Sequence, residues 1–150
     1  MKRIILLVAV VAALGMAGIP AAQASQYVRT ESGRVRCIVG PDRVACEASG
    51  PGSTGFPQAP ISMPESQCRY SPCPGGIHFD LAEVTSSGAF NWKDGNIGGG
   101  GMPQNDMVLN YGQTYQIQGW TVLPSSDGTR FTNDATGHGM FVSIENVAPF

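Results

Sequence analysis

Short runs in which apolar and polar residues alternate recur along the chain after its first 24 residues. In the last run, Met140, Val142 and Ile144 occupy every second position. Strict alternation places such residues on one face of a β-strand. Clusters of Gly, Pro, Ser and Asn separate the runs, as turns do in β-proteins. The pattern therefore predicts an all-β fold: a small, disulfide-braced antiparallel β-sandwich or barrel of about seven or eight strands.

Two of the runs predict a hairpin that also positions two cysteines. Residues 35–39 and 44–47 flank a four-residue turn, in which Pro41 sets φ for the first central position. If the last residue of the first run faces the first residue of the second, Cys37 lies opposite Cys46. Cross-strand partners are close enough for a disulfide, so we expect these two cysteines to be bonded.

The other two cysteines, Cys68 and Cys73, have four residues between them and can close a small disulfide loop. Pairings that link the two regions stay open at this point, because sequence alone does not exclude them. Zinc is a weaker interpretation, since Cys68, Cys73 and His78 lack the two-residue spacing typical of structural zinc sites. We therefore expect disulfides, and neither a metal nor another cofactor.

The middle of the chain predicts one strand and one long loop. Ile77, Phe79 and Leu81 occupy alternate positions, so we expect all three on the core face of a single strand. Residues 50–64 are crowded with Gly, Ser and Pro, and predict a loop with Phe56 as its only large apolar anchor.

The last third of the chain has the most regular pattern. Residues 107–109 and 114–117 flank a short turn and predict a hairpin. Gly119 permits a bulge, after which we expect Trp120 and Val122 to face inward.

The first 24 residues have the features of a secretory signal peptide. Lys2 and Arg3 precede an uncharged apolar stretch at 4–19, and small residues lead up to Ala24. Cleavage after Ala24 would leave one domain, residues 25–150, secreted or at the cell envelope. An uncleaved anchor is disfavoured because the stretch is shorter than the roughly 20 residues that span a bilayer. No later segment predicts a membrane span.

Composition narrows the possible functions. After residue 24 the chain has 18 Gly and 10 Pro in 126 residues but only three Leu, which excludes a helical bundle. The net charge is −2 for the whole chain, and 7 − 11 = −4 without Lys2 and Arg3. No basic run is present, which argues against nucleic-acid binding. The glycine-rich residues 94–101 lack the flanking helix of a phosphate-binding loop and predict a connector.

One turn, residues 133–139, holds the candidate functional residues. Asp134, Thr136 and His138 supply a carboxylate, a hydroxyl and an imidazole, the groups that hydrolytic sites use. The structural interpretation is that Asn133 and Asp134 start the turn through local hydrogen bonds, while its two glycines permit positive φ or close approach. We favour this interpretation because adjacent residues seldom supply a whole catalytic arrangement.

Two other sets of residues are weaker candidates for a functional site. His78 and Asp80 point to the same face of a predicted strand, and we interpret them as a solvated pair. Most aromatic residues are needed for the core of a chain so poor in leucine. Phe141 is the best candidate for an exposed contact, because it lies opposite the apolar face of its strand.

Several motifs occur in a characteristic order: Ser32-Gly33-x-Val35-x-Cys37, Val44-x-Cys46-Glu47, Tyr111-Gly112-x-Thr114, Gly119-Trp120 and Ala135-Thr136-Gly137-His138-Gly139. With these motifs the chain resembles a family of small exported proteins from mycobacteria and related actinobacteria. The resemblance covers most of the chain after the leader and implies export and a shared fold, but no activity. It also implies that a late disulfide of the family, near Val122 and Phe131, is missing in this chain.

These observations favour a non-enzymatic binding module that contacts an unidentified protein or envelope ligand through its loops. One alternative is a small hydrolase that uses His138 with Asp134 or Asp80. Another is a secreted enzyme inhibitor that displays the loop at 50–64 on a disulfide-braced scaffold.

Overall fold

The structure, a computed structural model, describes residues 24–49, 53–69, 72–98 and 105–150. Within these ranges nearly all of the regular secondary structure is β-strand, and a short 3-10 helix, η1 (Glu65–Gln67), lies in the middle of the chain. The predicted all-β fold is therefore confirmed. No helix of the described ranges is long and apolar enough to cross a membrane. The predicted signal peptide, apart from Ala24, lies outside the described residues.

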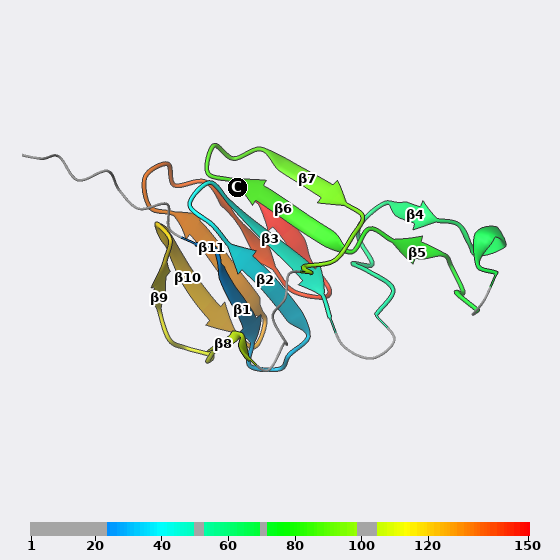
Figure 1. Cartoon of the computed structure of the whole chain (residues 1–150), viewed down its shortest axis with the longest axis horizontal. Coiled ribbons are helices and arrows are strands. Elements are labelled where there is room, and N and C mark those ends of the chain that lie inside the picture. Colours follow the sequence, from blue (N-terminus) through cyan, green and yellow to red (C-terminus); the bar gives the residue numbers. More distant parts are fainter. Residues whose placement is uncertain (1–23, 50–52, 70–71, 99–104) are drawn as a thin grey trace, which may run out of the picture.

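Two sheets contain most of the strands (Figure 1). In spatial order the larger sheet consists of β7 (Phe90–Lys93), β6 (Leu81–Thr85), β3 (Arg43–Ala48), β2 (Val35–Val39), β1 (Gln26–Thr30) and β8 (Met107–Leu109). The smaller sheet consists of β13 (Val147–Pro149), β12 (Gly139–Val142), β11 (Gly128–Asn133), β10 (Trp120–Ser125) and β9 (Tyr115–Ile117). A separate pair, β4 (Ile61–Met63) and β5 (Ile77–His78), projects from this body. The described residues thus hold thirteen strands, more than the seven or eight expected.

The core lies between the two sheets, so the architecture is a sandwich. Trp120, Phe131 and Met140 of the smaller sheet are fully buried against apolar residues of the larger one. The indole nitrogen of Trp120 donates a hydrogen bond across the core to the carbonyl oxygen of Gly40, at 2.9 Å. Aromatic side chains therefore fill the volume that leucine occupies in most domains, as the composition implied.

The first predicted hairpin is confirmed in its register. Val39 faces Val44 and Cys37 faces Cys46 across β2 and β3, and the two cysteines form a disulfide. Cys46 is fully buried and Cys37 nearly so. The second pair, Cys68 and Cys73, is also disulfide-bonded. No free cysteine occurs among the described residues.

The single strand expected around Ile77 is wrong. The chain forms β5, leaves the strand conformation, and then enters β6, which belongs to a different sheet. In β6 the core residues are Ala82 and Val84, whereas Leu81 is only partly buried. The reason is the pairing of Ala82 with Cys46, because a residue opposite a core-facing disulfide must face the core as well.

Two expectations for the last third are also wrong. Residues 107–109 and 114–117 do not pair: β8 runs parallel to β1 in the larger sheet, and β9 joins β10 in the smaller one. The turn between them crosses from one sheet to the other. Gly119 makes no bulge but closes the β9–β10 hairpin, with Gln118 and Gly119 at φ 54° and 80°. Two successive positive φ values are typical of a type I′ hairpin turn.

Other predictions for this region are confirmed. Trp120 and Val122 face the core, as do Met140 and Val142. Ile144 lies beyond β12, where the chain turns into β13. The loop at 50–64 contains the unexpected strand β4. Its anchor Phe56 is fully buried as predicted, but Phe56 is not the only large apolar residue there, since Ile61 and Met63 lie on β4.

Candidate functional site

The turn at 133–139 is built by local hydrogen bonds. The side-chain oxygen of Asn133 accepts hydrogen bonds from the backbone nitrogens of Ala135 and Thr136, at 3.2 and 3.1 Å. Gly137 has φ 76°, a value that favours glycine. Asn133 and Gly137 thus have the structural roles expected of them. The same expectation is wrong for Asp134, whose carboxylate bonds to Thr121 outside the turn.

The side chains of the three candidate residues diverge. Asp134 accepts a hydrogen bond from the hydroxyl of Thr121 on β10, whereas Thr136 donates its hydroxyl hydrogen to the carbonyl oxygen of Ser86. Nδ1 of His138 lies 3.4 Å from the carbonyl oxygen of Phe150. Among the described residues, no hydrogen bond joins the Asp134 carboxylate to the His138 ring.

The other proposed partner of His138, Asp80, lies at the opposite end of β6. Asp80 immediately precedes β6, and its carboxylate accepts a hydrogen bond from the backbone nitrogen of Gly95 at 2.9 Å. The His138 ring lies against Gly88, in the turn that follows β6. A strand of this length separates its ends by roughly 17 Å. His78 is occupied elsewhere, with Nδ1 2.6 Å from the carbonyl oxygen of Ala59.

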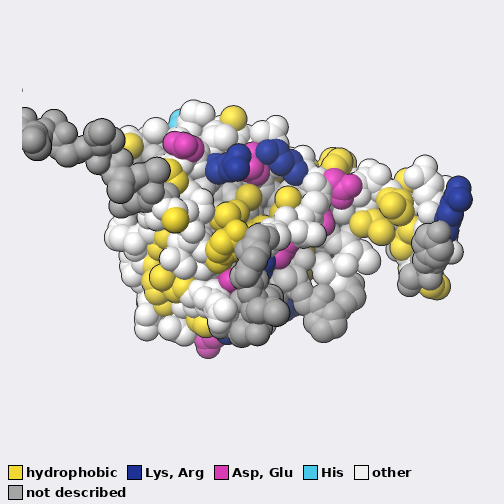
Figure 2. Space-filling view, viewed as in Figure 1, with side chains coloured by type: hydrophobic (Ala, Val, Ile, Leu, Met, Phe, Trp, Pro, Cys, Tyr) yellow, Lys and Arg dark blue, Asp and Glu magenta, His cyan; other side chains and the backbone are white. Residues whose placement is uncertain are grey.

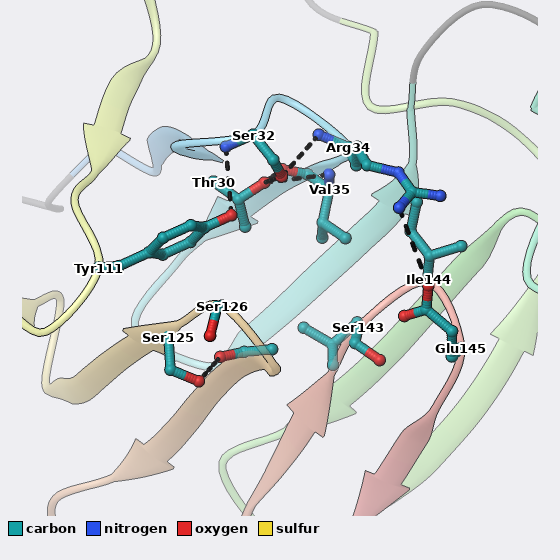
Figure 3. A pocket seen from close by; sticks show the side chains of 12 residues that line it. Thr30, Ser32, Arg34, Val35, Tyr111, Ser125, Ser126, Ser143, Ile144 and Glu145 are labelled. Carbon is teal, nitrogen blue, oxygen red and sulfur yellow. Dashed lines mark hydrogen bonds and ion pairs between the residues drawn. The ribbon is translucent and has the colours of Figure 1, made fainter.

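A second candidate is a shallow groove at the end of the sandwich, which we call the end groove (Figure 3). Turns of both sheets surround it, and it holds about 330 Å³ of space open to solvent. Six of the residues that line it carry a hydroxyl group: Thr30, Ser32, Tyr111, Ser125, Ser126 and Ser143. Arg34 and Glu145 face each other at 3.8 Å on its rim. The sequence patterns did not indicate this site, because its residues come from four separate turns.

The third candidate is the projecting part of the chain, residues 53–69 and 72–80, which we call the arm. It is inserted between β3 and β6, two adjacent antiparallel strands in which Glu47 faces Leu81. Such neighbours are commonly joined by two to five residues. Figure 1 shows the arm extending from the side of the sandwich, with β4, η1 and β5 along its length. The sandwich therefore does not require the arm for its own connectivity.

The arm is anchored at its root and braced at its tip. Phe56 packs in the core, with its ring centroid 5.7 Å from that of Trp92. The Cys68–Cys73 disulfide and a hydrogen bond from the Gly75 nitrogen to the Glu65 carboxylate hold the far end. These constraints act at both ends of a two-stranded sheet, which would be only marginally stable alone.

One face of the arm exposes large apolar side chains. Ile61 and Met63, two residues apart on β4, are 52% and 39% exposed. Apolar side chains gather along the arm in Figure 2, well away from the sandwich. The small disulfide loop was an available signal for a separate substructure, but the Gly- and Pro-rich composition indicated only a loop.

The described residues contain no group of three His, Cys, Asp or Glu side chains arranged to hold a metal ion. Comparison with protein-family models, curated proteins and solved structures finds no match. Fold and site thus define the class: a disulfide-braced β-sandwich with an inserted, apolar-faced arm.

Proposed function

We propose that this protein is an exported, non-enzymatic binding module that contacts an apolar surface of a partner through its arm. The observation that carries this proposal is the exposure of Ile61 and Met63 on a braced insertion. Long insertions in compact domains are more often functional than structural. A disulfide at the tip reduces the conformational entropy that the arm loses on binding.

Export is part of the same proposal. The leader predicts secretion or attachment at the cell envelope, and two disulfides are typical of proteins that fold in oxidising compartments. The resemblance to small exported actinobacterial proteins supports this placement. Val122 and Phe131, near the positions of the missing family disulfide, face each other across β10 and β11. Such a pairing is what a cross-strand bridge requires.

We expect the exported protein to begin at Ser25. Signal peptidase leaves small residues on the amino side of the cleaved bond, and Ala24 is the last of these. Intact mass and N-terminal sequencing of protein from the culture medium and the envelope measure this directly. Exported protein that retains Met1 to Ala24 would contradict the prediction.

Affinity capture tests the role of the arm. We expect the protein beginning at Ser25 to retain a partner from culture filtrate or envelope extract, and the double variant Ile61→Ser, Met63→Ser to bind it at least about tenfold more weakly. Two buried apolar contacts are worth enough for that loss. Both side chains are exposed, so the variant should fold normally.

The matched control is Leu123→Ser, which removes an equally exposed apolar side chain from the smaller sheet. It should retain full binding. The role of the arm would be refuted if the double variant and Leu123→Ser lost binding equally, or if neither lost any binding. Enzyme inhibition is one form that such binding could take, and inhibition assays with proteases and muramidases on the same variants would detect it.

A further inference from the structure

The end groove has a chemistry that the arm does not share. We propose that it binds a neutral saccharide, either a free sugar or the accessible end of a glycan chain. The inference concerns different residues from the arm and does not rest on its proposed role. It rests on the six hydroxyl-bearing residues gathered from both sheets, and on how their hydrogen bonds are arranged.

Most of these hydroxyl oxygens are held in place by the backbone. Ser32 Oγ accepts from the nitrogen of Arg34 at 3.4 Å and lies 3.2 Å from Thr30 Oγ1. Thr30 itself is saturated, because it also donates to the carbonyl oxygen of Val35 and accepts from the nitrogen of Val35. Ser125 donates to the carbonyl oxygen of Gly128 at 2.9 Å, and Ser143 accepts from the nitrogen of Asn146 at 3.0 Å. A hydroxyl oxygen has two lone pairs, so one that donates its hydrogen can still accept from a ligand. Ser125 and Ser143 thus present acceptors in fixed positions, which lowers the entropic cost of binding.

Tyr111 adds a donor to these acceptors. Its hydroxyl oxygen accepts a hydrogen bond from the nitrogen of Ser32 at 3.3 Å, which fixes the position of the group. No described residue accepts the hydrogen of this hydroxyl, so that hydrogen is available to a ligand. Figure 3 shows Tyr111 reaching across the groove toward the turn of Ser32. Each sugar hydroxyl both donates and accepts, and therefore matches a wall that offers both functions.

Other ligand classes fit the groove less well. An anion would meet the Glu145 carboxylate, 73% exposed on the rim, and Arg34 is already paired with that group. An apolar ligand would find only Val35, Val142 and Ile144 among the polar lining. The groove is shallow and open to solvent, so we expect a weak dissociation constant of about a millimolar.

The test is a titration of the isotope-labelled protein beginning at Ser25, followed by NMR. The probes are methyl glucoside, N-acetylglucosamine and chitotriose. Glycerol serves as a polyol without a ring, phosphate as an anion, and triglycine as a short peptide. We expect saturable shifts of the amide signals of Ser32, Arg34 and Ser126 with at least one of the three sugars. Glycerol, phosphate and triglycine should give no such shifts. Tighter binding of chitotriose than of the single sugars would indicate a glycan chain, and equal binding a free sugar.

Tyr111→Phe and Ser126→Ala should each weaken binding by about three- to tenfold, because each removes one hydroxyl group from the groove. Tyr111→Phe keeps the ring, so the fold is preserved. Ser87→Ala, an exposed serine in the turn between β6 and β7, is the matched control and should bind normally. Absence of saturable sugar binding, identical shifts with glycerol, binding of phosphate or triglycine instead, or unchanged affinity in both variants would overturn the proposal.

Discussion

Arg36→Ala should lower the free energy of unfolding by about 3–5 kcal/mol, the largest effect expected from any single charged residue of this chain. The side chains of Arg36 and Asp106 are only 8% and 2% exposed. Removing the guanidinium leaves the Asp106 carboxylate buried without its partner. An uncompensated buried charge is far more costly than the loss of an exposed ion pair.

Arg36 also joins parts of the chain that are distant in sequence. Nε and Nη2 donate to the two carboxylate oxygens of Asp106, and Nη1 donates to the carbonyl oxygen of Ile97. The Glu47 carboxylate accepts from the Ile97 nitrogen at 2.7 Å, and Arg36 lies over the Tyr27 ring. Hydrogen bonding to Asp106, which outweighs the opposing effect of burial, raises the pKa of Arg36. The residue therefore stays charged at every accessible pH.

Urea denaturation followed by circular dichroism measures the effect. Arg34→Ala is the matched control, because its ion pair with Glu145 is solvent-exposed and should contribute less than about 1 kcal/mol. The double variant Arg36→Met, Asp106→Leu removes both charges and should recover much of the lost stability. An Arg36→Ala protein as stable as Arg34→Ala would show that the buried Arg36–Asp106 pair contributes no more to stability than an exposed ion pair.

In the turn at 133–139, we expect Gly139→Ala to destabilise the protein most, by about 3 kcal/mol or more. A side chain at Gly139 would collide with the carbonyl oxygen of Phe131 and with the Phe150 ring. Gly139 also faces Thr132 in the β11–β12 ladder, so the strands cannot separate without losing register. Both the collision and the fixed register arise because Gly139 lies close to β11, and neither depends on a positive φ.

The other two substitutions in this turn should destabilise the protein less than Gly139→Ala does. Gly137→Ala should cost about 1–2 kcal/mol, because its φ of 76° is unfavourable for alanine although no atom obstructs the new side chain. His138→Ala removes an exposed ring and should cost less than about 1 kcal/mol. Thermal melts of the three variants test the ranking. A His138→Ala protein that melts normally but loses a measurable ester, peptide or glycan hydrolysis would establish the hydrolase alternative instead.

Features that depend on neighbours along the chain could be predicted from the residues alone. The alternation of apolar residues, the turn at Pro41 and the position of Cys37 opposite Cys46 all follow from local geometry, because strand residues alternate and a short turn sets the register. The same reasoning applies to Asn133 and Gly137, whose roles involve bonds and angles within one turn. The all-β class, the first disulfide and the local hydrogen bonds of Asn133 were predictable for this reason.

Features that depend on which strands meet could not be predicted, because they arise from contacts between distant parts of the chain. The local sequence does not show that β8 and β9 belong to different sheets. A short turn can join two strands of the same sheet, or one strand in each of two facing sheets. The core face of β6 depends on its pairing with β3, and the Arg36–Asp106 pair joins residues 70 positions apart. The arm and the end groove arise from the same long-range contacts. Periodicity describes which face of an element is apolar, but only the assembled sheets determine what lies against it.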